Sequence, residues 1–320
     1  MYRKHVRAMA AGAVGVVGSL VASVPALAEL KVVVTIKPLH ALVSQVMAGA
    51  GTPELLVKGA ASAHTYAMRP SDASILAQAD VFFRMSGTME PFTVKISKSL
   101  PARVQLVSLQ ATRGLKLYPR RTSATFEAEV NHGHGDHDHA NHANDNDRMD
   151  GHAWLDPVNA KVLADRIAEV LAARDPAKTD QFRANAAALK TKLDGLTQEL
   201  SRQLAPAAGK AYIVFHDALQ YFERRFGLAA VGSIAISPEI APSAKRLTIL
   251  RKRIAALGAV CIFAEPQFDA RLVESVAEGT KARTGAIDPE GARIEPGPEL
   301  YFELLRNLAR DLKGCLAPQA

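Results

Sequence analysis

The chain has 320 residues, of which 48% are hydrophobic, so it can bury one large or two medium-sized cores and is not globally disordered. It contains one Trp and six Tyr, and its 39 Lys and Arg residues form no dense stripe, which argues against a nucleic-acid-binding protein. The formal net charge is +7.

Residues 1–28 have the three parts of a secretory signal peptide. Three basic residues among the first seven precede an uncharged apolar run over 8–24, and Ala26-Leu27-Ala28 provides a small-residue cleavage site. A membrane anchor is the alternative, because the run approaches the length of a spanning helix. Its glycines and its Ala-x-Ala end favour cleavage, and we therefore expect an exported protein.

Strands alternate with helices over residues 29–109, which is typical of a mostly parallel sheet. The first run, 31–36, is rich in β-branched residues, as expected of a strand that is buried on both faces. A helical pattern follows to Gly49, Ser71 is predicted to cap a helix that ends at Ala79, and another helix should follow Pro91. The predicted strands cover 31–36, 54–57, 81–85 and 103–109.

Residues 110–151 have a different composition and are expected to form a disordered loop, with the His-rich part at about 124–150. Seven acids and one Arg lie between 127 and 150. The histidines fit low-affinity zinc capture near a cleft and, equally well, a solvated linker that binds metal incidentally. These accessory candidates are His132, His134, His137, His139 and His142.

Pro157 is well placed to open a helix to about Arg174, and a second helix should run over 175–205. Apolar residues spaced by three or four give this second helix one continuous stripe, and its length exceeds about 40 Å, enough to run along two lobes. The stripe consists of Phe182, Ala186, Leu189, Leu193, Leu196, Leu200 and Leu204.

Strand and helix alternation resumes after residue 206. The predicted strands are 212–215, 228–234, 259–263 and a segment that ends at Ile287, and a helix is expected to begin at Asp217. The basic helix 243–257 is interpreted as a solvated face, and a terminal helix should cover 298–316. The sequence therefore predicts an α/β protein with two lobes, 29–174 and 206–320, joined by the long helix.

Three histidines and one aspartate lie at the ends of predicted elements. His64 follows a strand, His152 follows the loop, and His216 and Asp288 each follow a strand. The crevice beyond the carboxyl ends of parallel strands is a common binding site, so these residues could share one metal ion between the lobes. Imidazole nitrogens suit zinc rather than calcium or magnesium. His40, after Pro38, is interpreted as a packed histidine beside the cleft and not as a ligand.

Six ordered motifs resemble those of the ZnuA family of periplasmic zinc-binding receptors of ABC importers. The resemblance covers the chain after residue 28 except for the His-rich segment. In chain order the motifs are Ile36–His40, Gly59–Asp72, which contains His64, His152–Pro157, Phe215–Ala218, Phe263–Phe268 and Ile287–Pro289.

The resemblance implies a periplasmic receptor, not an enzyme, with two lobes, a rigid backbone helix and zinc in the cleft between the lobes. It assigns His64, His152 and His216 as zinc ligands and leaves the fourth position to Asp288 or a water, because Ala63 stands where some members carry an acid. An ABC membrane permease is the implied partner. A periplasmic zinc chaperone is considered as a second partner, and we expect a monomer.

Cys261 and Cys315 are the two cysteines of the chain. Two cysteines in an exported protein most often form one disulfide, and two buried free thiols are the alternative. The resemblance implies the disulfide.

Three rival functions remain. An exported zinc hydrolase could use three His ligands, with Glu265 as its candidate acid, but the sequence has no His-Glu-x-x-His or Gly-x-Ser-x-Gly motif. A manganese or iron receptor of the same family would be expected to carry a carboxylate at position 216, where imidazole favours zinc. A surface adhesin is the third, and the lack of a lipid-attachment Cys near Ala28 argues against a Gram-positive-style anchor for it.

Overall fold

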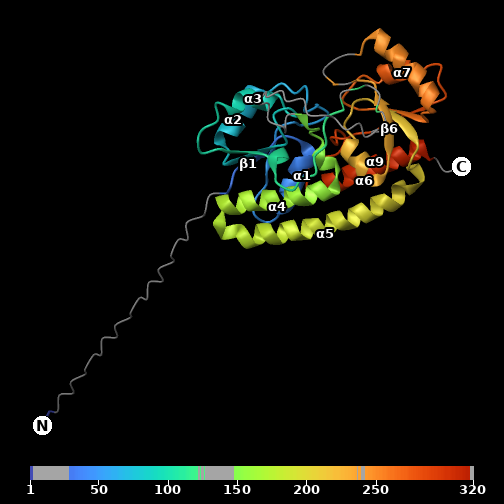
Figure 1. Cartoon of the computed structure of the whole chain (residues 1–320). Coiled ribbons are helices and arrows are strands. Elements are labelled where there is room, and N and C mark those ends of the chain that lie inside the picture. Colours follow the sequence, from blue (N-terminus) through green and yellow to red (C-terminus); the bar gives the residue numbers. More distant parts are fainter. Residues whose placement is uncertain are drawn as a thin grey trace, which may run out of the picture.

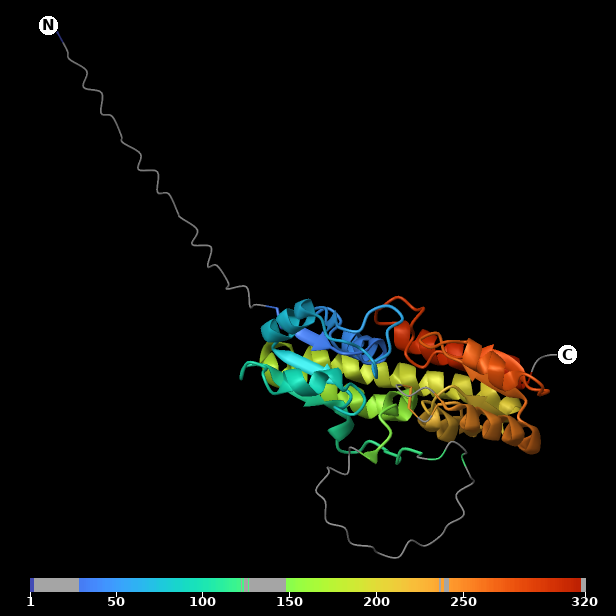
Figure 2. The ribbon, with the colours of Figure 1, turned by 90° about the horizontal axis from the view of Figure 1, so that it is seen from above.

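The computed structural model describes residues 1–2, 29–121, 123, 126, 148–235, 237–238 and 242–317. Two lobes lie side by side above a pair of long helices, α4 (Pro157–Arg174) and α5 (Thr179–Leu204) (Figure 1). In the view from above, α5 extends along both lobes (Figure 2). The predicted α/β architecture with two lobes on a long helix is confirmed.

The first lobe is built on a four-stranded parallel sheet with the strand order β2-β1-β3-β4. All three residues of β1 are buried, as the run of β-branched residues predicts. The elements are β1 (Val32–Val34), α1 (Lys37–Val46), β2 (Glu54–Leu55), α2 (Pro70–Gln78), β3 (Val81–Arg84), α3 (Phe92–Ser97), β4 (Gln105–Ser108) and η1 (Leu109–Ala111).

The second lobe repeats this plan with a parallel sheet of order β6-β5-β7-β8. Its elements are β5 (Ala211–Val214), α6 (Gln220–Phe226), β6 (Ala229–Ser233), α7 (Ala244–Leu257), β7 (Cys261–Ala264), α8 (Arg271–Ala277), β8 (Arg283–Ala286) and α9 (Leu300–Leu316). Short 3-10 turns lead into and out of the long helices, namely η3 (Ala153–Leu155), η4 (Pro176–Lys178) and η5 (Ala205–Ala207).

The backbone helix α5 buries the predicted stripe along its whole length. Every stripe residue from Phe182 to Leu204 is at most 2% exposed. Helix α5 packs against α4, against α1 of the first lobe and against α9 of the second lobe, so one continuous helix contacts both lobes. Its 26 residues correspond to about 39 Å of helix, close to the length expected from the sequence.

Two predicted helix starts are wrong. Helix α2 begins at Pro70, after the N-cap Arg69, because the Asp72 carboxylate accepts a hydrogen bond from the Arg69 backbone N–H at 2.8 Å and fixes the first turn there rather than at Ser71. Helix α6 begins at Gln220 and not at Asp217, because the chain first makes a tight turn in which Ala218 N–H donates to the carbonyl of residue 216. Helix α8 was not predicted.

The expectation of one disordered loop over 110–151 is wrong at both ends of the segment. Leu115, Leu117 and Tyr118 pack against the core, and Asp150 is buried. Pro119 and Met149 form an antiparallel bridge that joins the two ends. The sequence does not predict this packing, because the apolar residues of the segment stand singly and follow no helix or strand periodicity.

A disulfide joins Cys261 in β7 to Cys315 in α9, so the predicted pairing is confirmed. Among the described residues, no helix combines the length and apolarity needed to cross a membrane. The proposed signal peptide and the accessory histidines His132, His134, His137, His139 and His142 lie outside the described residues, apart from residues 1–2.

Candidate metal centre

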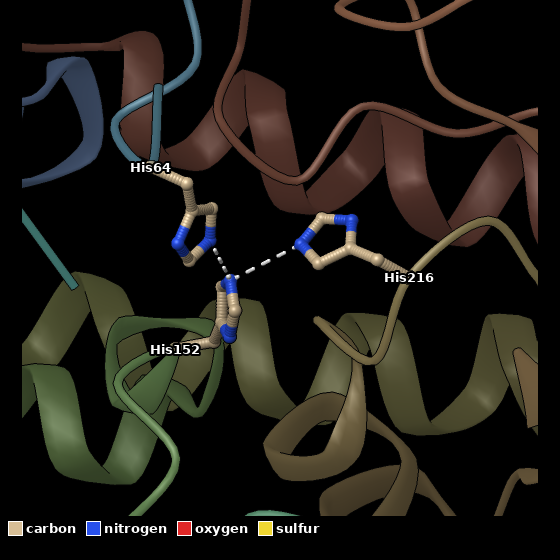
Figure 3. A group of neighbouring side chains, drawn as sticks. All are labelled: His64, His152 and His216. Carbon is tan, nitrogen blue, oxygen red and sulfur yellow. Dashed lines mark hydrogen bonds between the residues drawn. The ribbon is translucent and has the colours of Figure 1, made fainter. Parts of the chain in front are cut away.

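Three histidines from separate parts of the chain converge on one point (Figure 3). His64 lies in the loop between β2 and α2, His152 directly precedes η3, and His216 follows β5. One nitrogen of each lies within 4.8 Å of the other two. Within the described part of the chain, this is the only group of three or more His, Cys, Asp or Glu residues arranged in this way.

The spacing of the nitrogens fits a single zinc-sized ion. Nε2 of His152 lies 3.3 Å from Nε2 of His64 and 3.4 Å from Nε2 of His216. Two nitrogens bound to zinc at about 2.0–2.1 Å with a tetrahedral angle are about 3.3–3.4 Å apart. These two distances from His152 therefore match tetrahedral zinc ligation.

His152 is held by a carboxylate two residues before it. Oδ1 of Asp150 lies 2.7 Å from Nδ1 of His152 and accepts the backbone N–H of His152 at 3.0 Å. The 3-10 turn that follows leads to Asp156, whose side chain caps α4 by accepting from Val158 N–H. The ring is thus fixed by its own segment and by the start of α4.

His216 is held in the same way by Glu265. Oε1 of Glu265 lies 2.7 Å from Nδ1 of His216 and accepts its backbone N–H at 3.2 Å. His216 follows β5 and Glu265 follows β7, and these two strands are neighbours at the point where the strand order of the sheet reverses. Such switch points are where parallel α/β sheets bind ligands.

A carboxylate that accepts Nδ1–H leaves the lone pair of Nε2 free for a metal. Burial is the main cause, and the charge of His216 the second cause, that lowers the pKa of His152 to about 3. Burial, followed by His152 and His216, lowers the pKa of His64 well below 6.5. Burial alone would lower the pKa of His216, but the charge and hydrogen bond of Glu265 more than offset this and raise it. At least two of the three rings therefore present unprotonated nitrogen at neutral pH.

A cavity of about 280 Å³ adjoins the three rings. The base of the His-rich segment contributes to its wall through Arg120, Arg121, Met149 and Asp150. Arg121 is neutralised there by Asp217 and Glu223 of the second lobe, with N···O distances of 2.5 and 2.9 Å. The cavity gives an ion a route to the nitrogens.

The structure does not bring Asp288 into the histidine group. Its Oδ1 accepts from Gln267 Nε2 at 3.0 Å and from Gly291 N–H at 2.9 Å, and Asp288 lines a separate cavity of about 170 Å³. His40 also lies outside the group: it is buried, with Nε2 3.0 Å from the carbonyl oxygen of Pro53, in keeping with the prediction that it is packed.

Sequence analysis missed three carboxylates that support the histidines. The sequence puts Asp150 in the expected disordered loop, and Glu265 in the Phe263–Phe268 motif is named as a candidate hydrolase acid with no role beside a histidine. Glu290, which contacts the turn before His64, was not singled out. The position of Glu265 after a strand next to β5 was the signal that could have found it.

Residues 32–315 match the sequence profile of the ZnuA family, which is described as zinc-uptake complex component A, periplasmic. The high-affinity zinc uptake system protein ZnuA of Brucella suis biovar 1 is 46% identical over 308 residues, covering 89% of this chain and 91% of that protein. The protein of the same name from Paracoccus denitrificans is 37% identical over 311 residues, covering 92% of this chain and 94% of that protein.

Two solved structures share the fold. A crystal structure of ZnuA has a TM-score of 0.72 and 25% identity, covering 90% of this chain and 99% of that one. The laminin-binding adhesin Lmb of Streptococcus agalactiae, in a mutant structure, has the same TM-score, identity and coverage.

Proposed function

Because the chain belongs to the ZnuA family of zinc-uptake components, we propose that it is the zinc-binding receptor of a zinc-uptake system and that His64, His152 and His216 hold the ion. The observation that carries this assignment is the convergence of three imidazole nitrogens, with Nε2 of His152 at distances from the other two that suit tetrahedral zinc.

The donor set favours zinc over manganese or iron. All three converging donors are imidazole nitrogens, and the carboxylates Asp150 and Glu265 are engaged with Nδ1 atoms instead of facing the ion. For the fourth position we favour a water from the adjoining cavity over Asp288, because the Asp288 carboxylate is occupied by its own loop.

The same geometry supports a receptor rather than a hydrolase. A zinc hydrolase needs a general base within reach of the metal-bound water. Glu265, the acid considered for that role, orients His216 through Nδ1, on the side of the ring away from the converging Nε2 atoms.

In the proposed mechanism, zinc enters the cleft from the periplasm, binds the unprotonated nitrogens of His64 and His152, displaces the proton of His216 where that ring is protonated, and ties the two lobes together. His64 and His152 belong to the first lobe and His216 to the second, so one ion bonded to all three links the lobes. The zinc-loaded surface would then be recognised by the ABC membrane permease.

A competition titration tests the assignment. The zinc-free mature chain, freed of metal by a chelator, is titrated against a zinc indicator dye in parallel with the H64A, H152A and H216A variants and an H40Q control. We expect wild type and H40Q to bind one zinc tightly and each of the three alanine variants to lose that site. Tight one-to-one binding by all three alanine variants would contradict the assignment.

A further inference from the structure

The loop after β8, residues 288–294, leaves the second lobe and is fastened to the first lobe; we call it the crossing loop. Nζ of Lys37, in α1, donates to the carbonyl oxygens of Gly291, Ala292 and Ile294 at 3.0, 2.9 and 2.9 Å. Trp154 Nε1 donates to the Pro289 carbonyl at 3.3 Å. Lys37 is only 5% exposed, so this attachment lies inside the molecule.

Asp288 gives the crossing loop its shape. Oδ1 accepts from the backbone N–H groups of Glu290 and Gly291 at 3.3 and 2.9 Å, and Oδ2 accepts from Arg293 N–H at 3.4 Å. Gly291 has φ +73°, a conformation that favours glycine. Asp288, which the sequence suggests as a zinc ligand, therefore shapes the loop that carries Glu290.

Glu290 reaches back across the lobes to the turn that carries His64. Oε2 accepts from Ala63 N–H at 3.2 Å, and Oε1 accepts from Ser62 Oγ at 3.4 Å. Ser62 Oγ in turn accepts the backbone N–H of His64 at 3.3 Å. Ser62, Ala63 and Glu290 are all at most 6% exposed, so water cannot replace these hydrogen bonds while the contact is closed.

Glu290 differs in one respect from the two carboxylates that hold the other histidines. Asp150 belongs to the same segment as His152, and Glu265 to the same sheet as His216. Glu290 belongs to the lobe opposite to that of His64. Burial raises the pKa of Glu290 to about 7. A carboxyl oxygen accepts hydrogen bonds whether or not the group is ionised, and this acceptor reaches Ser62 and Ala63 only when the lobes are in register.

We propose that Glu290 is a positioning residue that couples closure of the two lobes to placement of His64, so that the zinc site is completed only in the closed form. This inference rests on the proposed zinc-binding function and adds to it the residue that retains the ion.

The test compares zinc dissociation from E290A, E290Q and S62A, measured by transfer of zinc to an excess of chelator. Removing a group that supports a metal ligand typically lowers metal affinity about 10–100-fold. If this loss appears in the dissociation rate, E290A should release zinc about 10–100-fold faster while still binding one zinc per chain. E290Q, whose amide can still accept from Ala63 N–H, should recover most of the slow release, and S62A should lie between E290A and wild type.

A matched control separates positioning from loss of stability. Glu90 is fully buried in the first lobe and accepts from Met85 and Ser86 N–H and from Thr35 Oγ1 at 2.6–2.9 Å. E90Q should leave the rate of zinc release unchanged. The proposal is overturned if E290A releases zinc at the wild-type rate, or if E90Q accelerates release as much as E290A. Failure of wild type to bind zinc would instead refute the proposed function.

Discussion

Replacing Glu265 by glutamine should separate two effects of this carboxylate on the zinc site. Its Oε1 lies 2.7 Å from Nδ1 of His216, and both side chains are at most 4% exposed. An amide of the same shape can keep the hydrogen bond but loses the charge. Since such supporting groups are worth about 10–100-fold in metal affinity, we expect E265Q to bind zinc about 10–100-fold more weakly at pH 8.

Although E265Q should bind zinc more weakly at pH 8, its zinc affinity should be less sensitive to a fall in pH than that of the wild type. Zinc requires unprotonated Nε2, so wild-type affinity should fall about tenfold per pH unit below the pKa of His216, which Glu265 raises above 6.5. In E265Q the burial of the ring dominates and the pKa of His216 falls below 6.5. The variant should therefore begin to lose zinc at a lower pH, and its deficit relative to wild type should shrink between pH 8 and pH 5.5.

The assay is a chelator-competition titration of both proteins at half-unit pH steps, with E90Q as a control that keeps the wild-type profile. A ratio of affinities that stays constant with pH, or that widens as pH falls, would show that Glu265 does not control protonation of His216. Unchanged affinity at pH 8 would show that the charge of Glu265 does not strengthen His216 as a zinc ligand.

Three further predictions follow from the site and its surroundings. Deleting residues 131–144, which hold the five accessory histidines, should remove weak extra zinc sites and leave one tight site in a calorimetric titration. Loss of the tight site would show that the tight site depends on the accessory histidines. His216→Glu should weaken zinc binding and narrow its preference over manganese, because an oxygen donor replaces a nitrogen; a titration with competing metals measures this, and unchanged selectivity would contradict it. Cys315→Ser should lower the free energy of unfolding by about 2–5 kcal/mol in urea denaturation while one-to-one zinc binding persists, because the Cys261–Cys315 bridge joins β7 to α9 away from the histidines; an equal stability would oppose this account.

Elements defined by local pattern could be predicted from the sequence. The β-branched run 32–34 gave a fully buried strand, and the stripe from Phe182 to Leu204 gave the backbone helix, because burial of these faces decides their structure. The start of α6 could not be predicted, since it depends on a turn that keeps His216 at the end of β5 beside Glu265.

The candidate site was predictable only in part. Motifs placed His64, His152 and His216 at element ends, but their convergence depends on how the two lobes sit on α5. The exclusion of Asp288 from the group depends on backbone N–H groups of residues 290–293, which no sequence pattern reports. The roles of Asp150 and Glu290 likewise arise from contacts made by the folded chain.

The two lobes share a strand order but use their switch points differently, and this asymmetry bears on how the site works. In the second lobe the point between β5 and β7 holds His216 and Glu265. In the first lobe the corresponding point between β1 and β3 is filled by Glu90, which accepts from Thr35 Oγ1 and from two backbone N–H groups after β3.

The first lobe supplies its two histidines from segments that flank its sheet. His152 gains rigidity from Asp150 and the start of α4, whereas His64 lies on the 14-residue loop 56–69 between β2 and α2. A ligand on such a loop needs an external restraint to be held within reach of the ion, and Glu290 of the opposite lobe supplies one. Motion on zinc release should accordingly concentrate in residues 59–69, and amide hydrogen exchange there should rise on zinc removal more than at residues 152 or 216.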